Sequence, residues 1–326
     1  QGLTAKVNTS AAGSADVLNV SLTEGADTDY NALTVANVET LNINVTEDTA
    51  GGNAASRTAT IGLAISQTTA AAGGSGAAQS VVITGSEDIT IDTAVAVATI
   101  DASGMSARLA TTPGLVMTGA AHTKAQTITG SSGADTIVGS TKADTISTGA
   151  GNDTITGGLG ADTIDGGTGT DTFIGTGALT AANVEGAGTG QSTGVVVNLG
   201  ATTLTAAAVL GTAAQNLSGG LTGVASGQVA YLFNGELGTN SAAVDTLTSI
   251  ENVTLADGIN YIVGTTGANS ITGGSGVDTI VAGNGADTVT GSGGNDVITL
   301  TETAANSAVD TVVMTGAIAG LGSDSV

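Results

Sequence analysis

The stretch Gly149–Gly175, GAGNDTITGGLGADTIDGGTGTDTFIG, decides the fold. Within it an aspartate recurs every nine residues, at Asp153, Asp162 and Asp171. Each aspartate follows a glycine-rich tripeptide and precedes Thr and one large apolar residue. So strict a period indicates a repeat architecture, in which each unit buries its apolar face by stacking on its neighbours.

The same nine-residue pattern extends outward from this stretch into two arrays. One array occupies Gly130–Ile174 and the other Gly264–Thr299. The sixth position of the aligned repeats holds an acid or its amide, namely Asp135, Asp144, Asp153, Asp162, Asp171, Asn269, Asp278, Asp287 and Asp296. The eighth position is always apolar: Ile137, Ile146, Ile155, Ile164, Phe173, Ile271, Ile280, Val289 and Ile298.

The residue types predict the shape of one repeat. The three residues that end it, such as Asp-Thr-Ile, form a very short strand whose apolar residue points inward. The glycine-rich half forms a turn, because glycine adopts positive φ and lets main-chain carbonyls approach closely. Nine residues make half a coil, so residues 18 apart stack on one another. The turn glycines expected to place carbonyl ligands are Gly149, Gly151, Gly158, Gly160, Gly167, Gly169, Gly274, Gly276, Gly283 and Gly285.

Stacking of this kind brings carboxylates together on successive rungs, roughly 5 Å apart. Each such pair repels by about 1–4 kcal/mol, depending on the effective dielectric. A hard cation reverses the sign of that interaction. Calcium accepts six to eight oxygen ligands in irregular geometry, whereas magnesium demands a tight octahedron. The sequence therefore predicts Ca²⁺ as the cofactor of both arrays.

These repeats resemble the RTX nonapeptide G-G-x-G-x-D-x-U-x, a calcium-binding β-roll motif. The resemblance implies that each ion lies between turns two repeats apart, held by sixth-position side chains and carbonyls. It implies about four or five ions, shared by the pairs Asp135–Asp153, Asp153–Asp171, Asp144–Asp162, Asp278–Asp296 and, more weakly, Asn269–Asp287.

Several residues depart from the motif, and four of them bear on the metal sites. Ser131 and Ser140 replace the second glycine, Lys142 replaces the fourth, and Asn269 replaces the acid. The first and sixth repeats therefore read as fraying ends, and Lys142 weakens the case for a metal site at the second repeat. A metal-free alternative stays open, in which each aspartate caps its own turn by hydrogen bonding.

The composition argues against several classes of function. The chain has 5 Lys+Arg against 28 Asp+Glu, a net charge of −23, so nucleic acid is an unlikely partner. It has no Cys and a single histidine, His122, which argues against thiolate or histidine metal sites and against catalytic triads. No apolar run reaches the length of a transmembrane helix. The first residue is Gln, and we expect the chain to be a piece of a longer protein.

The remaining segments predict an all-β fold: a right-handed parallel β-solenoid with RTX β-roll arrays and additional irregular strands. Short runs with apolar residues at alternate positions and hardly an aromatic favour a solenoid over a sandwich. A short helix is left open over Thr205–Leu217. The expected regions are a solenoid-like region at 1–125, arrays at 126–176 and 263–300, a β-rich insertion at 177–262 and a terminal strand at 301–326.

Three segments, Val35–Glu47, Leu247–Gly258 and Ala98–Met105, are similar to elements of RTX-type surface-layer (S-layer) proteins of Gram-negative bacteria. Glu39 and Glu251 within them either close a strand turn or bind metal. No H-E-x-x-H motif occurs and the chain has a single histidine, so no enzyme is expected and no catalytic residue is assigned.

The resemblance implies a secreted, calcium-dependent, lattice-forming structural protein at the cell surface. Its partners would be copies of itself, and its anchor would lie outside this chain. The alternative is a calcium-stiffened repeat region of a type I-secreted RTX adhesin or exoprotein.

Overall fold

The computed structural model describes an all-β chain. No helix occurs among the residues described, so none there is long and apolar enough to cross a membrane. The chain divides into two compact units, Gln1–Gly158 with Gly166–Gly169, and Leu159–Asp165 with Thr170–Val326. The structure describes residues 3–6, 17–24, 29–36, 38–47, 58–66, 80–91, 97–106, 113–117, 124–175, 192–205, 215–217, 223–234, 244–300 and 308–313.

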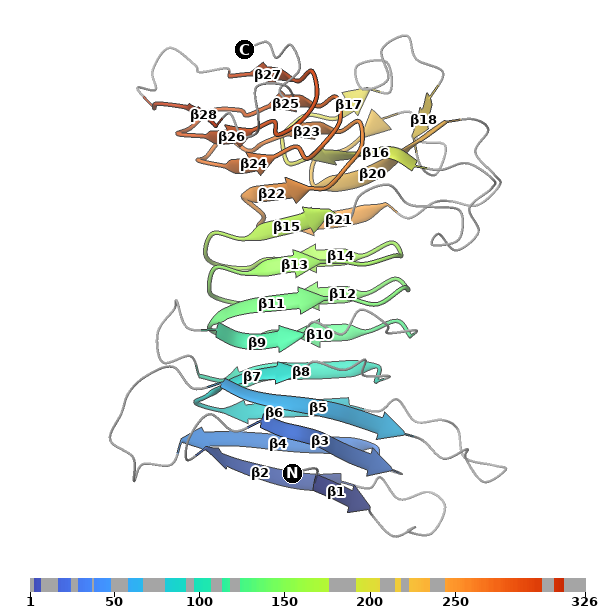
Figure 1. Cartoon of the computed structure of the whole chain (residues 1–326), viewed down its shortest axis with the longest axis vertical. Coiled ribbons are helices and arrows are strands. Elements are labelled where there is room, and N and C mark those ends of the chain that lie inside the picture. The colour runs from blue at the N-terminus through green and yellow to red at the C-terminus, as the bar shows by residue number, and fades with distance from the viewer. Residues whose placement is uncertain are drawn as a thin grey trace. The chain divides into compact units, whose positions relative to one another are not determined.

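The first unit consists of two parallel sheets whose strands alternate along the chain (Figure 1). One sheet has the order β1 (Leu3–Lys6), β3 (Asp29–Ala36), β5 (Thr58–Ser66), β7 (Asp88–Ile91), β9 (Pro113–Met117), β11 (Ala134–Val138), β13 (Thr154–Thr156). The other has the order β2 (Val17–Glu24), β4 (Thr40–Glu47), β6 (Ser80–Gly85), β8 (Thr99–Met105), β10 (Thr127–Thr129), β12 (Thr145–Ser147). Successive strands therefore alternate between the two sheets, as a β-solenoid requires.

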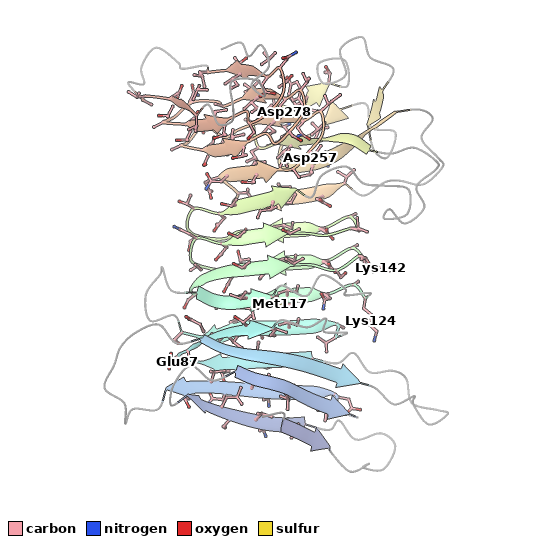
Figure 2. The ribbon with its side chains drawn as sticks, in the orientation of Figure 1. Glu87, Met117, Lys124, Lys142, Asp257 and Asp278 are labelled. Atoms are coloured by element: carbon pink, nitrogen blue, oxygen red, sulfur yellow. The ribbon has the colours of Figure 1, made fainter. Side chains whose placement is uncertain are left out.

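The core of the first unit is a set of apolar ladders between the sheets. Ile128 pairs with Ile146, and Ile137 pairs with Ile155, at most 1% of each side chain being exposed. Met117 continues the ladder below Ile137 and is fully buried (Figure 2). The expected stacking of residues 18 apart is thus confirmed.

The second unit continues the same design with one interruption. Its first sheet has the order β15 (Thr172–Gly175), β22 (Asn252–Leu255), β24 (Ser270–Thr272), β26 (Thr288–Thr290), β28 (Thr311–Val313). Its second has the order β14 (Thr163–Asp165), β21 (Asp245–Thr248), β20 (Gln228–Asn234), β16 (Ser192–Asn198), β23 (Tyr261–Val263), β25 (Thr279–Val281), β27 (Val297–Thr299). β20 runs antiparallel to β16, β18 (Gln215–Leu217) and β21, and these are the antiparallel pairs among the described pairs of a sheet that is otherwise parallel.

Three short strands complete the insertion. β18 (Gln215–Leu217) pairs with β20, and β17 (Leu204–Thr205) pairs with β19 (Gly223–Val224). The helix left open over Thr205–Leu217 has strand at both described ends, and residues 206–214 between them lie outside the described residues, as does His122.

Candidate metal centre

The sixth-position side chains of all nine repeats are buried, with 0–4% of each exposed. The strand that follows fixes the direction of the side chain. The carboxylate reaches back to the rung 18 residues earlier in the repeats of Asp144, Asp153, Asp278, Asp287 and Asp296. Oδ1 of Asp153 accepts a hydrogen bond from the N–H of Asp135 at 2.7 Å, and Oδ1 of Asp296 accepts one from Asp278 at 3.0 Å. The predicted rows of stacked acids therefore lie inside the turns.

Asp278 shows that a carboxylate buried in these turns needs a balancing charge. Its Oδ1 accepts the N–H of Asn260 at 2.9 Å, while its buried Oδ2 accepts no hydrogen bond. Burial raises the pKa of Asp278 to about 7, the N–H of Asn260 opposes that rise, and the charge of Asp296 adds to it. Burial likewise raises the pKa of Asp153. A buried carboxylate of this kind requires a proton or a cation.

The glycine turns stack with main-chain carbonyls in close contact. Gly276 has a φ of 130°, and a Cβ on it would lie 1.9 Å from the carbonyl oxygen of Gly258. Gly167 has a φ of 86°, and its Cβ would lie 2.0 Å from that of Gly149. Only glycine fits there, and the space that it leaves is faced by carbonyl oxygens.

The donor set of the turns fits calcium. In the described part of the chain no three His, Cys, Asp or Glu side chains form a cluster, so an ion in these turns would be held by few carboxylates together with carbonyls. Oxygen ligands of mixed charge in an irregular cage suit calcium. Sixth-position carboxylates such as that of Asp278, together with the carbonyls of the predicted turn glycines, would hold it there.

In three of the predicted sites, those of Asp135, Asp144 and Asn269, the sixth side chain accepts hydrogen bonds from the second residue of its own turn. Asp135 is the first of them. Its Oδ1 accepts the N–H of Leu115 and the hydroxyl of Ser131, and its Oδ2 accepts the N–H of Ser131, each at 2.7 Å. Burial raises its pKa to about 6 even though these bonds lower it. Asp144 likewise accepts the N–H and the hydroxyl of Ser140 on its two oxygens, whereas Oδ1 of Asn269 accepts both from Thr265.

The acidic columns contain residues that sequence reasoning missed. Oδ1 of Asp245 accepts the N–H of Asp162 at 3.0 Å, and Oδ1 of Asp310 accepts that of Asp287 at 3.1 Å. Glu251, left open between turn and metal, accepts the N–H of Asp171 through Oε2 at 2.8 Å and so holds a sixth-position place.

Asn260 occupies another such place, since its N–H bonds Asp278 across 18 residues. The sequence carried a signal for it: Leu255–Val263, LADGINYIV, has Gly258 at position four, Asn260 at six and Ile262 at eight. Asp310 likewise begins DTVV, which resembles DTIV at Asp135. Neither residue aligns with the repeats by sequence alone, because neither segment has glycine at both positions two and four.

Comparison with known families agrees with this geometry. The model of the RTX calcium-binding nonapeptide repeat matches in four copies, at residues 129–164, 138–173, 256–289 and 272–300. No curated protein matches the chain. The two arrays are therefore RTX calcium-binding nonapeptide repeats, and such repeats bind Ca²⁺. The third copy begins at residue 256 and so includes Asn260.

Proposed function

We propose that this chain is the calcium-dependent, lattice-forming region of a secreted bacterial surface-layer protein. The observation that carries the calcium dependence is the buried Oδ2 of Asp278, which accepts no hydrogen bond and belongs to a column of buried acids. The surface-layer role is supported by the similarity of the three segments described above and by the net charge of −23. Calcium bridging between acidic copies follows from that charge.

The mechanism is a thermodynamic linkage. Calcium that binds only the folded arrays raises the free energy of unfolding by RT ln(1 + [Ca]/Kd) for each site. Extracellular calcium modules have dissociation constants of about 10⁻⁴–10⁻³ M. At the far lower calcium of a cytosol the acid columns repel and the arrays stay loose, which suits export of an unfolded chain. Outside the cell, calcium folds and locks them.

The test is calcium removal followed by calcium return. With EGTA, the β signal of the arrays in circular dichroism and the particle size should both fall, and added calcium should restore both and yield two-dimensional sheets visible by electron microscopy. Survival of β signal and assembly in EGTA would contradict the proposal. Magnesium at the same concentration is the control.

The alternative is a stiffened stalk of a type I-secreted adhesin or exoprotein. The arrays alone suit it equally well, since stiffening needs only calcium between turns. A stalk would gain β signal with calcium yet remain monomeric, so particle size separates the two functions.

A further inference from the structure

The nine turns fall into two classes by the conformation of their second and fourth residues. In six turns both of these residues have positive φ: Gly149 and Gly151, Gly158 and Gly160, Gly167 and Gly169, Gly274 and Gly276, Gly283 and Gly285, Ser292 and Gly294. In the other three, Gly130–Asp135, Gly139–Asp144 and Gly264–Asn269, neither residue does. These three are called the closed turns, and the six are called the open turns.

The closed turns share one set of hydrogen bonds. The second residue is Ser131, Ser140 or Thr265, and its N–H donates to the sixth side chain at 2.5–2.9 Å. Its hydroxyl donates to the same side chain at 2.7–3.2 Å. The N–H of the fourth residue donates to that hydroxyl at 3.0–3.1 Å. The turn therefore satisfies its own acid or amide.

This bonding also explains Lys142. A fourth residue in an open turn needs positive φ, which a lysine rarely adopts. In the closed turn the N–H of Lys142 instead bonds Ser140 Oγ at 3.0 Å with ordinary φ, and its side chain projects from the edge of the unit (Figure 2). Serine at position two and lysine at position four therefore fit the same closed turn.

The closed turns come first in their columns of repeats. Asp135 and Asp144 bond back to Leu115 and Gln126, neither of which lies in a glycine-rich repeat. Asn269 donates through Nδ2 to the carbonyl of Glu251. Here an amide N–H faces a carbonyl oxygen, a contact that elsewhere would place two oxygens together and call for a cation.

Ser292 shows that a serine alone does not close a turn. It is the second residue of the Asp296 repeat, yet its φ is 76°. That turn stacks on an open one, since Gly276 N–H donates to the Gly293 carbonyl at 2.6 Å and Gly293 N–H to that of Gly274 at 3.2 Å. Closure therefore accompanies a hydroxyl at position two in the first turn of a column.

We propose that the sixth-position side chains of the three closed turns do not bind calcium and that these turns act as caps at the start of each array. The inference rests on the calcium binding of the proposed function and deepens it, because it restricts the carboxylate ligands to the open turns. Those ligands are Asp153, Asp162, Asp171, Asp278, Asp287 and Asp296. In the caps, hydroxyl and N–H donors stabilise the buried sixth side chain, as the ion does in the open turns.

The experiment compares two double variants of the first array by calorimetric calcium titration and native mass spectrometry. Asp135→Asn with Asp144→Asn should bind as many ions as the unmodified chain, because Asn269 already accepts both closing bonds through Oδ1. Asp153→Asn with Asp162→Asn should lose ions. The far-ultraviolet circular dichroism of each variant in calcium reports whether it folds.

The outcomes separate the two proposals. Equal loss of ions in both variants overturns the caps and leaves the calcium function standing. An unmodified chain that takes up no calcium overturns the function and the caps with it. Crystals of the unmodified chain grown in calcium give a check independent of variants: anomalous peaks should lie beside open-turn acids, and an ion ligated by Asp135, Asp144 or Asn269 refutes the caps.

Discussion

At the scale of the residue, glycine at position four has two environments that the repeat motif does not distinguish. Gly276 in an open turn has a φ of 130° and no room for a Cβ. Gly267 in a closed turn lacks positive φ, and the nearest atom to its Cβ would be Thr265 Oγ1 at 3.7 Å. Glycine at position four is therefore required in an open turn and replaceable in a closed turn.

Alanine at these two glycines should give opposite results. Gly276→Ala should lower the free energy of unfolding in calcium by at least about 1–3 kcal/mol, from backbone strain alone. Gly267→Ala, the matched control, should change it by no more than about 0.5–1 kcal/mol. Urea unfolding at fixed calcium measures both. Equal losses would show that the two turn classes are not distinct.

The raised pKa values of the buried acids predict a pH dependence. Burial raises the pKa of Asp278 to about 7 from 3.8, so between these values the calcium-free folded state binds more protons than the unfolded state. The stability of the calcium-free protein should therefore fall as pH rises from 4 towards 7. Thermal unfolding in EGTA across this range measures it, and a stability that rises with pH would contradict the assignment.

Calcium must displace those protons when it binds below pH 7. We expect proton release on calcium binding at pH 6 and very little at pH 8. Titration calorimetry in buffers of different ionisation enthalpy counts the protons. The variant Asp278→Asn should release fewer, and an unchanged count would place the titration elsewhere.

At the scale of the element, the strands of the arrays were predictable and the insertion was not. A nine-residue period with an apolar eighth residue fixes both the strand and its inward side chain, as the full burial of Ile155 and Ile280 confirms. Nothing comparable marks β16 and β20, whose runs GVVVNLG and VAYLFNG show strands but neither their antiparallel pairing nor their place between β21 and β23. Pairing between distant strands depends on tertiary contacts that no local pattern carries.

The candidate site was predictable to the same extent. Sequence placed all nine sixth-position residues in buried turns, because the period fixes their register. The closed turns could not be separated from the open ones by reading, since Ser140 and Ser292 occupy the same position with different φ. That difference arises from the neighbouring rung, which the alignment of repeats does not contain.

Asn198 holds the insertion together. It is fully buried at the end of β16, and its Nδ2 donates to the carbonyls of Thr202 and Val224, each at 2.9 Å. Its Oδ1 accepts the N–H of Gly200 at 3.1 Å. The side chain thus serves three main-chain groups around the insertion.

Asn198→Ala should therefore destabilise the second unit by about 1–3 kcal/mol for each carbonyl left unsatisfied. Calcium uptake by the first array should be unchanged, which a terbium luminescence titration compared with the unmodified chain measures. Thr203→Ala, at an exposed residue of the same segment, is a control that should leave the urea midpoint in place. A midpoint unmoved in Asn198→Ala would show that water replaces these bonds.

At the scale of the whole molecule, the strands before the arrays stack mainly through neutral ladders, with one pair of acids in register, Glu24 of β2 and Glu47 of β4. Asn42 bonds Asn19 at 2.7 Å and Thr84 bonds Asn44 at 3.1 Å, both between neutral side chains. The apolar residues that alternate with them along the strand, such as Ile43, are buried in the core. Apart from the Glu24–Glu47 pair, these ladders carry no repulsion for calcium to relieve.

Hydrogen exchange should separate the two kinds of strand. In EGTA, amides of β4 and β6 should keep their protection, while those of β13, β25 and β27 should exchange much faster; calcium should slow only the latter group. Mass spectrometry of peptides after exchange in EGTA and in calcium makes the comparison. Loss of protection in both groups would mean that the arrays and the preceding strands fold as one unit.

The hairpin of β16 and β20 has a mechanical consequence. In one sheet of the second unit β22 contacts β24 directly, whereas in the other two additional strands separate β21 from β23. At the usual strand spacing these add about 10 Å to one side of the coil only. We expect a coil lengthened on a single side to curve, so β16 and β20 would set the direction of this segment while calcium in its turns would set its rigidity.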